Sequence, residues 1–171
     1  VRHAGTQGAQ EGEGHGMKIN IRGYEVLIDD EDYERVMANG PWRKHIGSNN
    51  QYFIHTSARP EHKNILLHRF ILNAPSFLQV DHINNNTFDN RKCNLRLCTH
   101  QENMFNTSKR RKTKTKYKGV SRAHSLIEKW CARIWVNGSP ITLGTFSTQE
   151  LAHTAYCRAA KKYHGEFARF V

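Results

Sequence analysis

Asp81 and His82 stand side by side in the segment VDHINNNTFDNRKCNLRLCTHQEN, which runs from Val80 to Asn103. Hydrolysis of a phosphodiester needs an activated water and a cation that stabilises the charge developing on the departing 3′ oxygen. A histidine suits the first task because its unperturbed pKa, about 6.5, makes it a base near neutral pH. A carboxylate suits the second because Mg²⁺ prefers oxygen ligands. The segment therefore has two interpretations, a metal-dependent hydrolytic site or a long polar turn.

The hydrolytic interpretation requires particular elements around Asp81 and His82. On an extended strand, neighbouring side chains point to opposite faces, which would separate a metal ligand at Asp81 from a base at His82. A second oxygen ligand is expected from Asn103, on a helix that begins after an N-cap at Thr99. An amide paired with one carboxylate keeps the site less anionic, which favours a polyanionic substrate.

The stretch between these elements, NNNTFDNRKCN, predicts a turn-rich loop because Asn and Asp bond their own backbone and tolerate left-handed conformations. Asn94 is expected to begin a second strand, where its amide could bridge the two sides of the loop and fix the direction of His82. Arg96 on that strand has two interpretations, a phosphate ligand or a solvated charge at a sheet edge.

The net charge of +11 is confined to the second half of the chain. Residues 1–80 carry nine Lys/Arg and nine Asp/Glu, whereas residues 81–171 carry 17 and six, and 17 − 6 = +11. A localised cationic field attracts polyanions, of which nucleic acid is the commonest. The alternative is a basic surface that serves only solubility.

The N-terminal half predicts a small β-rich region. Residues 1–16 are Gly-rich without periodicity and are expected to form a disordered leader before Met17. The patterns INIRGYEVLIDD, QYFIHTSAR and NILLHRFIL predict strands, and DDEDYERVMANG predicts a short helix closed by Gly40. We expect this region to buttress the hydrolytic site.

A run of basic residues separates this half from the C-terminal segment. Seven of the ten residues from Lys109 to Lys118 are cationic, so the run is expected to stay extended as a linker. Two roles remain open for it, a strap that follows DNA phosphates or a solvated tail. The candidate phosphate contacts are Lys109, Arg110, Arg111 and Lys112.

The C-terminal segment predicts three strands and one helix. Alternation from Trp130 to Val136 indicates a strand, Asn137-Gly138 a hairpin turn, and ITLGTF the returning strand. The S-x-x-E pattern from Ser147 to Glu150 predicts a capping box, followed by a helix that stops at Gly165. Its apolar face is expected to hold Leu151, Ala155, Ala159 and Tyr163.

The four cysteines are too few and too scattered for the disulfide framework of a small secreted domain, so we expect reduced thiols. Cys93, Cys98 and His100 invite a zinc interpretation, but their spacing and the lack of a second Cys pair argue against it. No apolar run reaches the roughly 20 residues of a membrane span. A soluble, intracellular protein is the expectation.

Asp81-His82, Asn94-Leu95-Arg96 and Glu102-Asn103 together resemble the HNH endonuclease family. The likeness extends from about Val26 to Asn106, and LHRFIL with QVDH is similar to the phage and intron-encoded branch. The resemblance implies a ββα-metal fold, with His82 as general base, Asp81 and Asn103 as ligands of a divalent cation, and Asn94 as a structural residue. The expected cation is Mg²⁺ or Mn²⁺, and a zinc-structured binding module built on Cys93, Cys98 and His100 stays the weaker alternative. The recurring His68 receives no role.

The segment from Tyr117 onward resembles the AP2/ERF DNA-binding domain, through KGV, LGTF, the T-x-E-x-A-x-x-A-Y helix and AAKKYHGEFA. The resemblance implies a three-stranded sheet that reads the major groove. At several reading positions this chain departs from the family, so the family's target sequence is not carried over. Candidate DNA contacts carried over by position are Lys118, Ser121, Arg122, Arg133, Trp135 and Thr142, with Thr145 as a phosphate contact.

These observations define an α+β protein with four segments: a leader (1–16), an HNH nuclease domain (17–107, motif 80–106), a basic linker (108–116) and an AP2/ERF-like domain (117–171). The expected function is a homing or phage-encoded nicking or cleaving endonuclease. Its partner is double-stranded DNA, without a small-molecule cofactor or a membrane, in the cytoplasm of a bacterial host. The alternative is a catalytically silent DNA-binding regulator. Target sequence and oligomeric state stay open.

Overall fold

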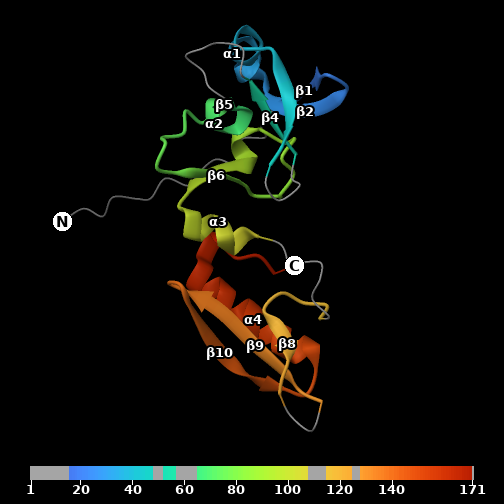
Figure 1. The fold of residues 1–171 in the computed structure, drawn as a ribbon, viewed down its shortest axis with the longest axis vertical. Helices are drawn as coiled ribbons and strands as arrows, with labels where there is room; N and C mark the ends of the chain where they lie inside the picture. Colours follow the sequence, from blue (N-terminus) through green and yellow to red (C-terminus); the bar gives the residue numbers. More distant parts are fainter. Residues whose placement is uncertain (1–15, 48–51, 57–64, 108–114, 125–127, 171) are drawn as a thin grey trace, which may run out of the picture. The chain divides into compact units, whose positions relative to one another are not determined.

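The computed structural model describes residues 16–47, 52–56, 65–107, 115–124 and 128–170 (Figure 1). Within them the chain combines small sheets with short helices, which confirms the predicted mixture of α and β structure. It forms two compact units, one made of residues 1–73 and 86–95 and the other of residues 74–85 and 96–171. The sequence-predicted linker and leader fall largely outside the described residues, as do Lys109, Arg110, Arg111 and Lys112.

The first unit begins with a hairpin where the sequence pattern predicted one strand. β1 (Gly16–Ile21) pairs antiparallel with β2 (Tyr24–Asp29). Arg22 and Gly23 both have positive φ, 51° and 90°, as a two-residue primed turn requires. The turn was missed because it lacks the usual Asn-Gly or Asp-Gly pair.

A three-stranded sheet and two helices complete this unit. The sheet has the order β3 (Trp42–Ile46), β4 (Tyr52–Thr56), β5 (Ile65–Leu66), and β3 was not predicted. The helices are η1 (Asp30–Asp32) with α1 (Tyr33–Ala38), and α2 (Leu67–Ile71). The strand predicted over NILLHRFIL is therefore mostly wrong, since Leu67, His68 and Ile71 recur at helical spacing and are buried on α2.

The second unit contains the small sheet of β6 (Gln79–His82) and β7 (Leu95–Cys98), followed by α3 (His100–Asn106). Leu95, the first residue of β7, is counted with the first unit.

The rest of the second unit is built on a three-stranded antiparallel sheet of order β10-β9-β8. Its strands are β8 (Val120–Arg122), β9 (Trp130–Val136) and β10 (Ser139–Phe146). α4 (Gln149–His164) packs on this sheet and continues into η3 (Gly165–Phe167). The Asn137-Gly138 turn joins β9 to β10, both residues having positive φ.

Two details of α4 differ from expectation. The N-cap is Thr148, whose side chain accepts a hydrogen bond from the Leu151 amide, and not Ser147. The buried face carries Ala152, Tyr156, Ala159, Ala160 and His164, whereas Leu151 and Tyr163 are exposed. The predicted face was wrong because an Ala-rich helix has several faces that are apolar enough to be buried. The face that packs on the sheet is the one that places Tyr156 against Ile134.

Candidate active site

β6 and α3 carry the residues that the sequence assigned to hydrolysis. Asp81 and His82 are the last two residues of β6, and both are buried. Thr99 caps α3 as predicted: its Oγ1 accepts from the Glu102 amide while the Glu102 carboxylate accepts from the Thr99 amide. These bonds lower the pKa of Glu102, so the capping carboxylate stays ionised. The cap fixes where α3 begins and therefore which side chains it presents towards β6.

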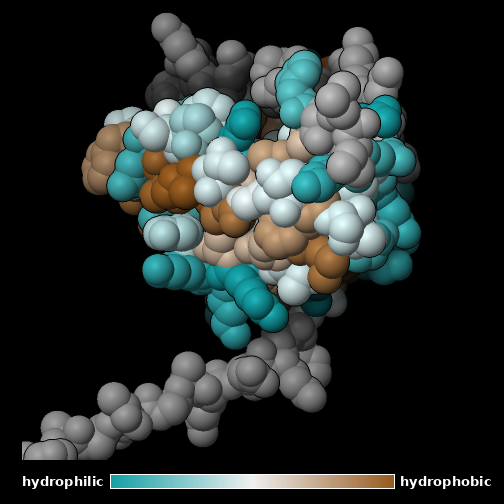
Figure 2. Space-filling view, turned by 90° about the horizontal axis from the view of Figure 1, so that it is seen from below, coloured by the Kyte–Doolittle hydropathy of each residue, from teal (hydrophilic) through white to brown (hydrophobic). Residues whose placement is uncertain are grey.

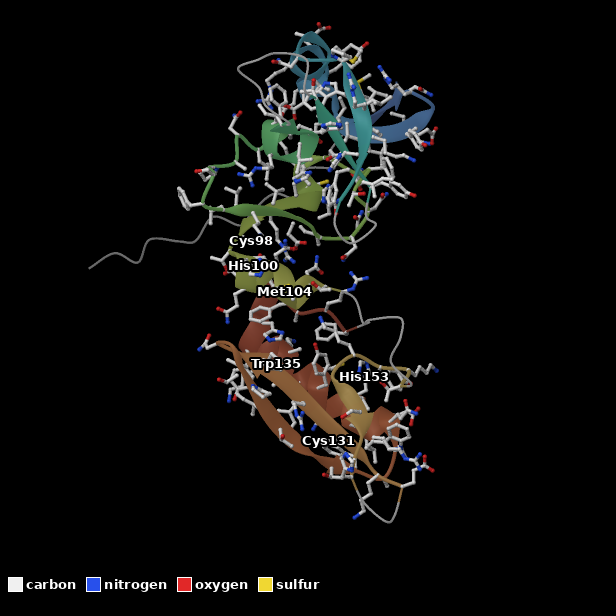
Figure 3. All side chains as sticks on the ribbon, viewed as in Figure 1. Cys98, His100, Met104, Cys131, Trp135 and His153 are labelled. Atoms are coloured by element: carbon white, nitrogen blue, oxygen red, sulfur yellow. The ribbon has the colours of Figure 1, made fainter. Side chains whose placement is uncertain are left out.

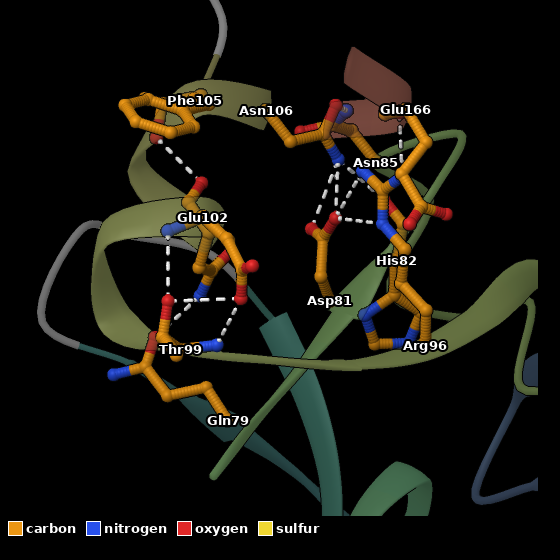
Figure 4. Close-up of polar contacts among 12 residues, drawn as sticks. Gln79, Asp81, His82, Asn85, Arg96, Thr99, Glu102, Phe105, Asn106 and Glu166 are labelled. Carbon is orange, nitrogen blue, oxygen red and sulfur yellow. Dashed lines mark hydrogen bonds and ion pairs between the residues drawn. The ribbon is translucent and has the colours of Figure 1, made fainter. Parts of the chain in front are cut away.

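The Asp81 carboxylate lies within a network of hydrogen-bond donors (Figure 4). Arg96 donates to Oδ2 from Nε at 2.9 Å and from Nη2 at 2.7 Å. Asn106 donates its Nδ2 to both carboxylate oxygens at 2.9 Å and to the His82 carbonyl oxygen at 3.1 Å. Oδ2 therefore accepts three of these bonds and Oδ1 accepts one.

Asn106, the last residue of α3, is a site residue that sequence reasoning missed. The predicted ligand Asn103 instead donates its Nδ2 to Gln79 Oε1 at 2.7 Å. Asn106 lies three residues beyond Asn103, close to one helical turn, so both amides point from one side of α3 towards β6. That spacing in ENMFN is a signal that could have identified Asn106.

The sequence assigned catalysis to His82, and in the structure two hydrogen bonds hold its carbonyl oxygen. The His82 carbonyl oxygen accepts from the Asn85 amide at 2.8 Å as well as from Asn106. Asn85 has φ of 61°, the left-handed conformation expected of an asparagine in this loop. Because neighbouring residues of a strand face opposite ways, the imidazole of His82 leaves β6 on the side opposite the Asp81 carboxylate.

The oxygen atoms of Asp81 and Asn103 are of the kind that binds a hard divalent cation. Mg²⁺ takes one or two carboxylate or amide oxygens and keeps several waters. Asp81 Oδ1 accepts one of these hydrogen bonds, and Asn103 bonds Gln79 through its Nδ2 and not through its carbonyl oxygen. Within the described residues, no three His, Cys, Asp or Glu side chains cluster as a metal site.

The cysteines of the zinc interpretation differ in environment. Cys98 is buried, and burial raises the pKa of its thiol to about 11, helped by the nearby Asp81 carboxylate. Cys93 is exposed. Zinc is bound by thiolates, so a zinc ion at Cys98 would have to displace the proton of this thiol.

Asn94 belongs to the first unit, where it closes the loop between β6 and β7. Its Nδ2 donates to the Asp89 carbonyl oxygen at 2.7 Å, and it ends the short helix η2 (Lys92–Asn94). Two backbone hydrogen bonds of 2.8 Å join the loop to Leu27 of β2. The Leu27 amide donates to the Phe88 carbonyl oxygen, and the Asn90 amide donates to the Leu27 carbonyl oxygen. A structural role for Asn94 is thus supported by a bond within the loop, while its predicted effect on His82 stays a prediction.

Several of the predicted DNA contacts lie on the exposed face of the β8-β9-β10 sheet. Arg133 pairs directly with Thr142, and Trp135 with Pro140, so these side chains share the face opposite α4. Trp135 is 59% exposed, and Figure 3 marks it on β9. Ser121 lies on this face through its pairing with Cys131, whereas Arg122 pairs with Trp130 and falls on the other face, where it contacts Glu128 at 3.7 Å. On the visible surface in Figure 2, hydrophobic and hydrophilic residues are interleaved.

Two cations predicted to meet DNA are engaged within the protein. Lys118 donates its Nζ to the Phe105 carbonyl oxygen at the end of α3, at 2.6 Å, and burial lowers its pKa to about 8. The Arg96 side chain is largely buried beside Asp81, which matches neither interpretation offered by the sequence. DNA contacts of both residues stay predictions and would require these bonds to open.

Comparison with known proteins identifies the class of the nuclease region. Residues 73–105 match the family model described as HNH endonuclease. A curated relative, an uncharacterised HNH endonuclease of Acanthamoeba polyphaga mimivirus, is 36% identical over 108 residues, which cover 60% of this chain and 54% of the relative. The chain thus spans about half the length of that relative. No solved structure matches the chain.

These matches show that residues 73–105, which include Asp81, His82 and Asn103, are similar to the HNH endonuclease family, the resemblance predicted from the sequence. Metal-dependent cleavage of DNA by this chain stays a prediction. No helix in the described part of the chain has the length and hydrophobicity needed to cross a membrane.

Proposed function

We propose that this protein is a metal-dependent DNA endonuclease in which His82 activates the attacking water and Asp81 and Asn103 hold a divalent cation. The observation that carries the proposal is the pair formed by Asp81 and His82 at the end of β6, inside the segment that matches the HNH model. Both residues are buried, and Arg96 and Asn106 hold the Asp81 carboxylate by hydrogen bonds, as is usual for a buried polar group.

The proposed reaction is a single hydrolysis at phosphorus. The imidazole of His82 takes a proton from water as the water oxygen bonds to phosphorus, and the bond from phosphorus to the 3′ oxygen breaks. The cation supplies stabilisation for the charge on the departing oxygen when it is bound. Arg96 and Asn106 donate hydrogen bonds to the Asp81 carboxylate and hold it in the place where it would bind the cation.

We propose that residues 117–171, the C-terminal module, direct the nuclease to its DNA target. Its three-stranded sheet exposes Arg133, Trp135 and Thr142 on one face, as an AP2/ERF-like domain that reads double-stranded DNA would. Linking this module to a nuclease region raises the local concentration of each at the DNA, so neither needs to bind tightly alone. A homing or phage-encoded enzyme is the biological setting that such a pairing suits.

Cleavage of supercoiled plasmid tests the proposal. The purified protein is incubated with plasmids carrying bacterial and phage DNA libraries, with Mg²⁺, with Mn²⁺ and with EDTA, and products are separated as nicked and linear forms. Metal-dependent cleavage that disappears in His82→Ala while DNA affinity persists is the expected result. Binding to a plasmid without cleavage under every divalent ion would instead favour the silent DNA-binding regulator.

A further inference from the structure

The guanidinium of Arg96 is held from two sides. One side donates to Asp81 Oδ2 through Nε and Nη2. On the other, Nη1 donates to the Glu166 carbonyl oxygen at 2.7 Å, and Cζ lies 3.9 Å above the centroid of the Phe167 ring. Figure 4 shows Arg96 reaching between Asp81 and Glu166. The residues on the second side belong to η3, the turn that follows the C-terminal helix.

The position of η3 is itself fixed by contacts with α3. The ring of His164, the last residue of α4, stacks on Phe105 of α3, with centroids 3.7 Å apart and planes inclined by 9°. His164 also contacts the Trp135 carbonyl oxygen through Nε2 at 2.8 Å. Gly165 then reverses the chain with φ of 55°, a conformation that a side chain would strain. The end of the C-terminal module therefore lies where it can contact Arg96.

We propose that Phe167 and the Glu166 carbonyl are positioning groups for Asp81, acting through Arg96. This inference rests on the proposed nuclease function. An arginine side chain can adopt many rotamers. Here the Phe167 ring on one face of the guanidinium, with the Asp81 carboxylate and the Glu166 carbonyl oxygen at its edges, favours a single rotamer of Arg96. Arg96 then holds Asp81 by Oδ2, which leaves Oδ1 as the oxygen with capacity for the cation. The C-terminal module thus completes the catalytic centre in addition to contacting DNA.

Replacement of the Phe167 ring tests this role. Phe167→Leu keeps an apolar side chain at this buried position but removes the ring beneath Arg96, and Phe167→Tyr restores it. Phe170→Leu is the matched control, because Phe170 lies in the same segment and is 41% exposed. Thermal unfolding verifies that each variant is folded. Arg96→Lys is the second variant, since it keeps the positive charge and loses the planar fork.

Two readouts separate positioning from general stability. In ¹⁵N-labelled protein, the Arg96 Nε–H resonance should be protected from exchange and shifted by the Phe167 ring, and both properties should be lost in Phe167→Leu and recovered in Phe167→Tyr. For cleavage, Phe167→Leu should lower kcat by about 10-fold to 100-fold and raise the Mg²⁺ concentration needed for half-maximal rate. DNA affinity measured with Ca²⁺ should stay within about twofold of wild type, a change too small to count as lost binding energy.

The outcomes distinguish the inference from the function beneath it. If wild type cleaves and Phe167→Leu cleaves equally well at every Mg²⁺ concentration, the positioning role is wrong and the nuclease assignment survives. The same holds if Arg96→Lys retains full kcat. If wild type cleaves no DNA with any divalent ion, the nuclease proposal fails and the positioning role fails with it.

Discussion

Arg96 and Asp81 form an ion pair in which two nitrogens of one guanidinium, Nε and Nη2, donate to the same carboxylate oxygen. The two side chains are only 13% and 7% exposed. Removing one partner of a buried pair leaves an uncompensated charge, whereas removing both can cost little. Substitution of either residue should therefore change the free energy of unfolding, which can be measured independently of catalysis.

Arg96→Leu is expected to lower the free energy of unfolding by about 3–5 kcal/mol, the cost of leaving the Asp81 charge unpaired in a buried site. The double variant with Asp81→Asn should be less destabilised than the sum of the single variants. Urea unfolding of the four proteins gives the coupling energy. Additive effects would contradict a direct interaction.

Substitutions of Asn103 and of Asn106 should have different effects on stability and on cleavage. Asn106→Leu removes the donor shared by Asp81 and the His82 carbonyl oxygen, so it should lower the free energy of unfolding by about 1.5–3 kcal/mol, the range for bonds to charged groups. Asn103→Ala removes one bond to Gln79, which is partly exposed, and should cost less than about 1.5 kcal/mol. Cleavage should nevertheless be lost in Asn103→Ala, if Asn103 is the ligand. Equal cleavage by Asn103→Ala and wild type would show that Asn103 is not a metal ligand.

The cap of α4 gives a third prediction with a neighbouring control. Thr148→Ala should destabilise the protein by about 1 kcal/mol because the Leu151 amide loses its acceptor. Ser147→Ala, one residue earlier, should change stability by less than about 0.5 kcal/mol, as for an exposed site without such a bond. Thermal or urea unfolding of both variants decides between them. A larger effect at Ser147 would restore the capping box read from the sequence.

The sequence predicted elements better where local signals were unambiguous. Strict alternation and an Asn-Gly turn located the β9-β10 hairpin, and Thr99 with Glu102 located the start of α3. At Ser147-Thr148 two adjacent residues could each cap a helix, and only the structure selects one. The contacts of Arg96 with Glu166 and Phe167 lie 70 residues away in the chain, beyond the reach of any local pattern.

Histidine burial predicts a loss of stability in mild acid. Burial lowers the pKa of His164, the Trp135 carbonyl partly opposes this, and nearby Lys118 adds to it. The folded protein therefore keeps the neutral imidazole while the unfolded chain binds a proton near pH 6.5. The unfolding free energy should be steady above about pH 6.5 and fall below it until His164 protonates in the folded state.

His164→Phe keeps a ring against Phe105 and removes the titrating group, so it should flatten this decline by at most about 1.4 kcal/mol per pH unit. Some slope should persist, because burial also lowers the pKa of His55 and His153. Urea unfolding between pH 5 and pH 7.5 is the measurement, at about half-unit steps that resolve the expected slope. An unchanged slope in His164→Phe would show that folding does not lower the pKa of His164.

The two tryptophans of β9 should have opposite effects when replaced. Trp135 is 59% exposed on the face with Arg133 and Thr142, so Trp135→Ala should leave the unfolding free energy within about 0.5 kcal/mol of wild type and weaken DNA binding. Trp130 is half-buried against the cluster of Val120, Ala132 and Ala152 on the α4 side, so Trp130→Ala should mainly destabilise the fold. Fluorescence anisotropy with labelled duplex DNA, paired with urea unfolding, measures both quantities. Because the two side chains belong to one strand and differ in face, unchanged DNA affinity in Trp135→Ala would show that this face of the sheet does not meet DNA.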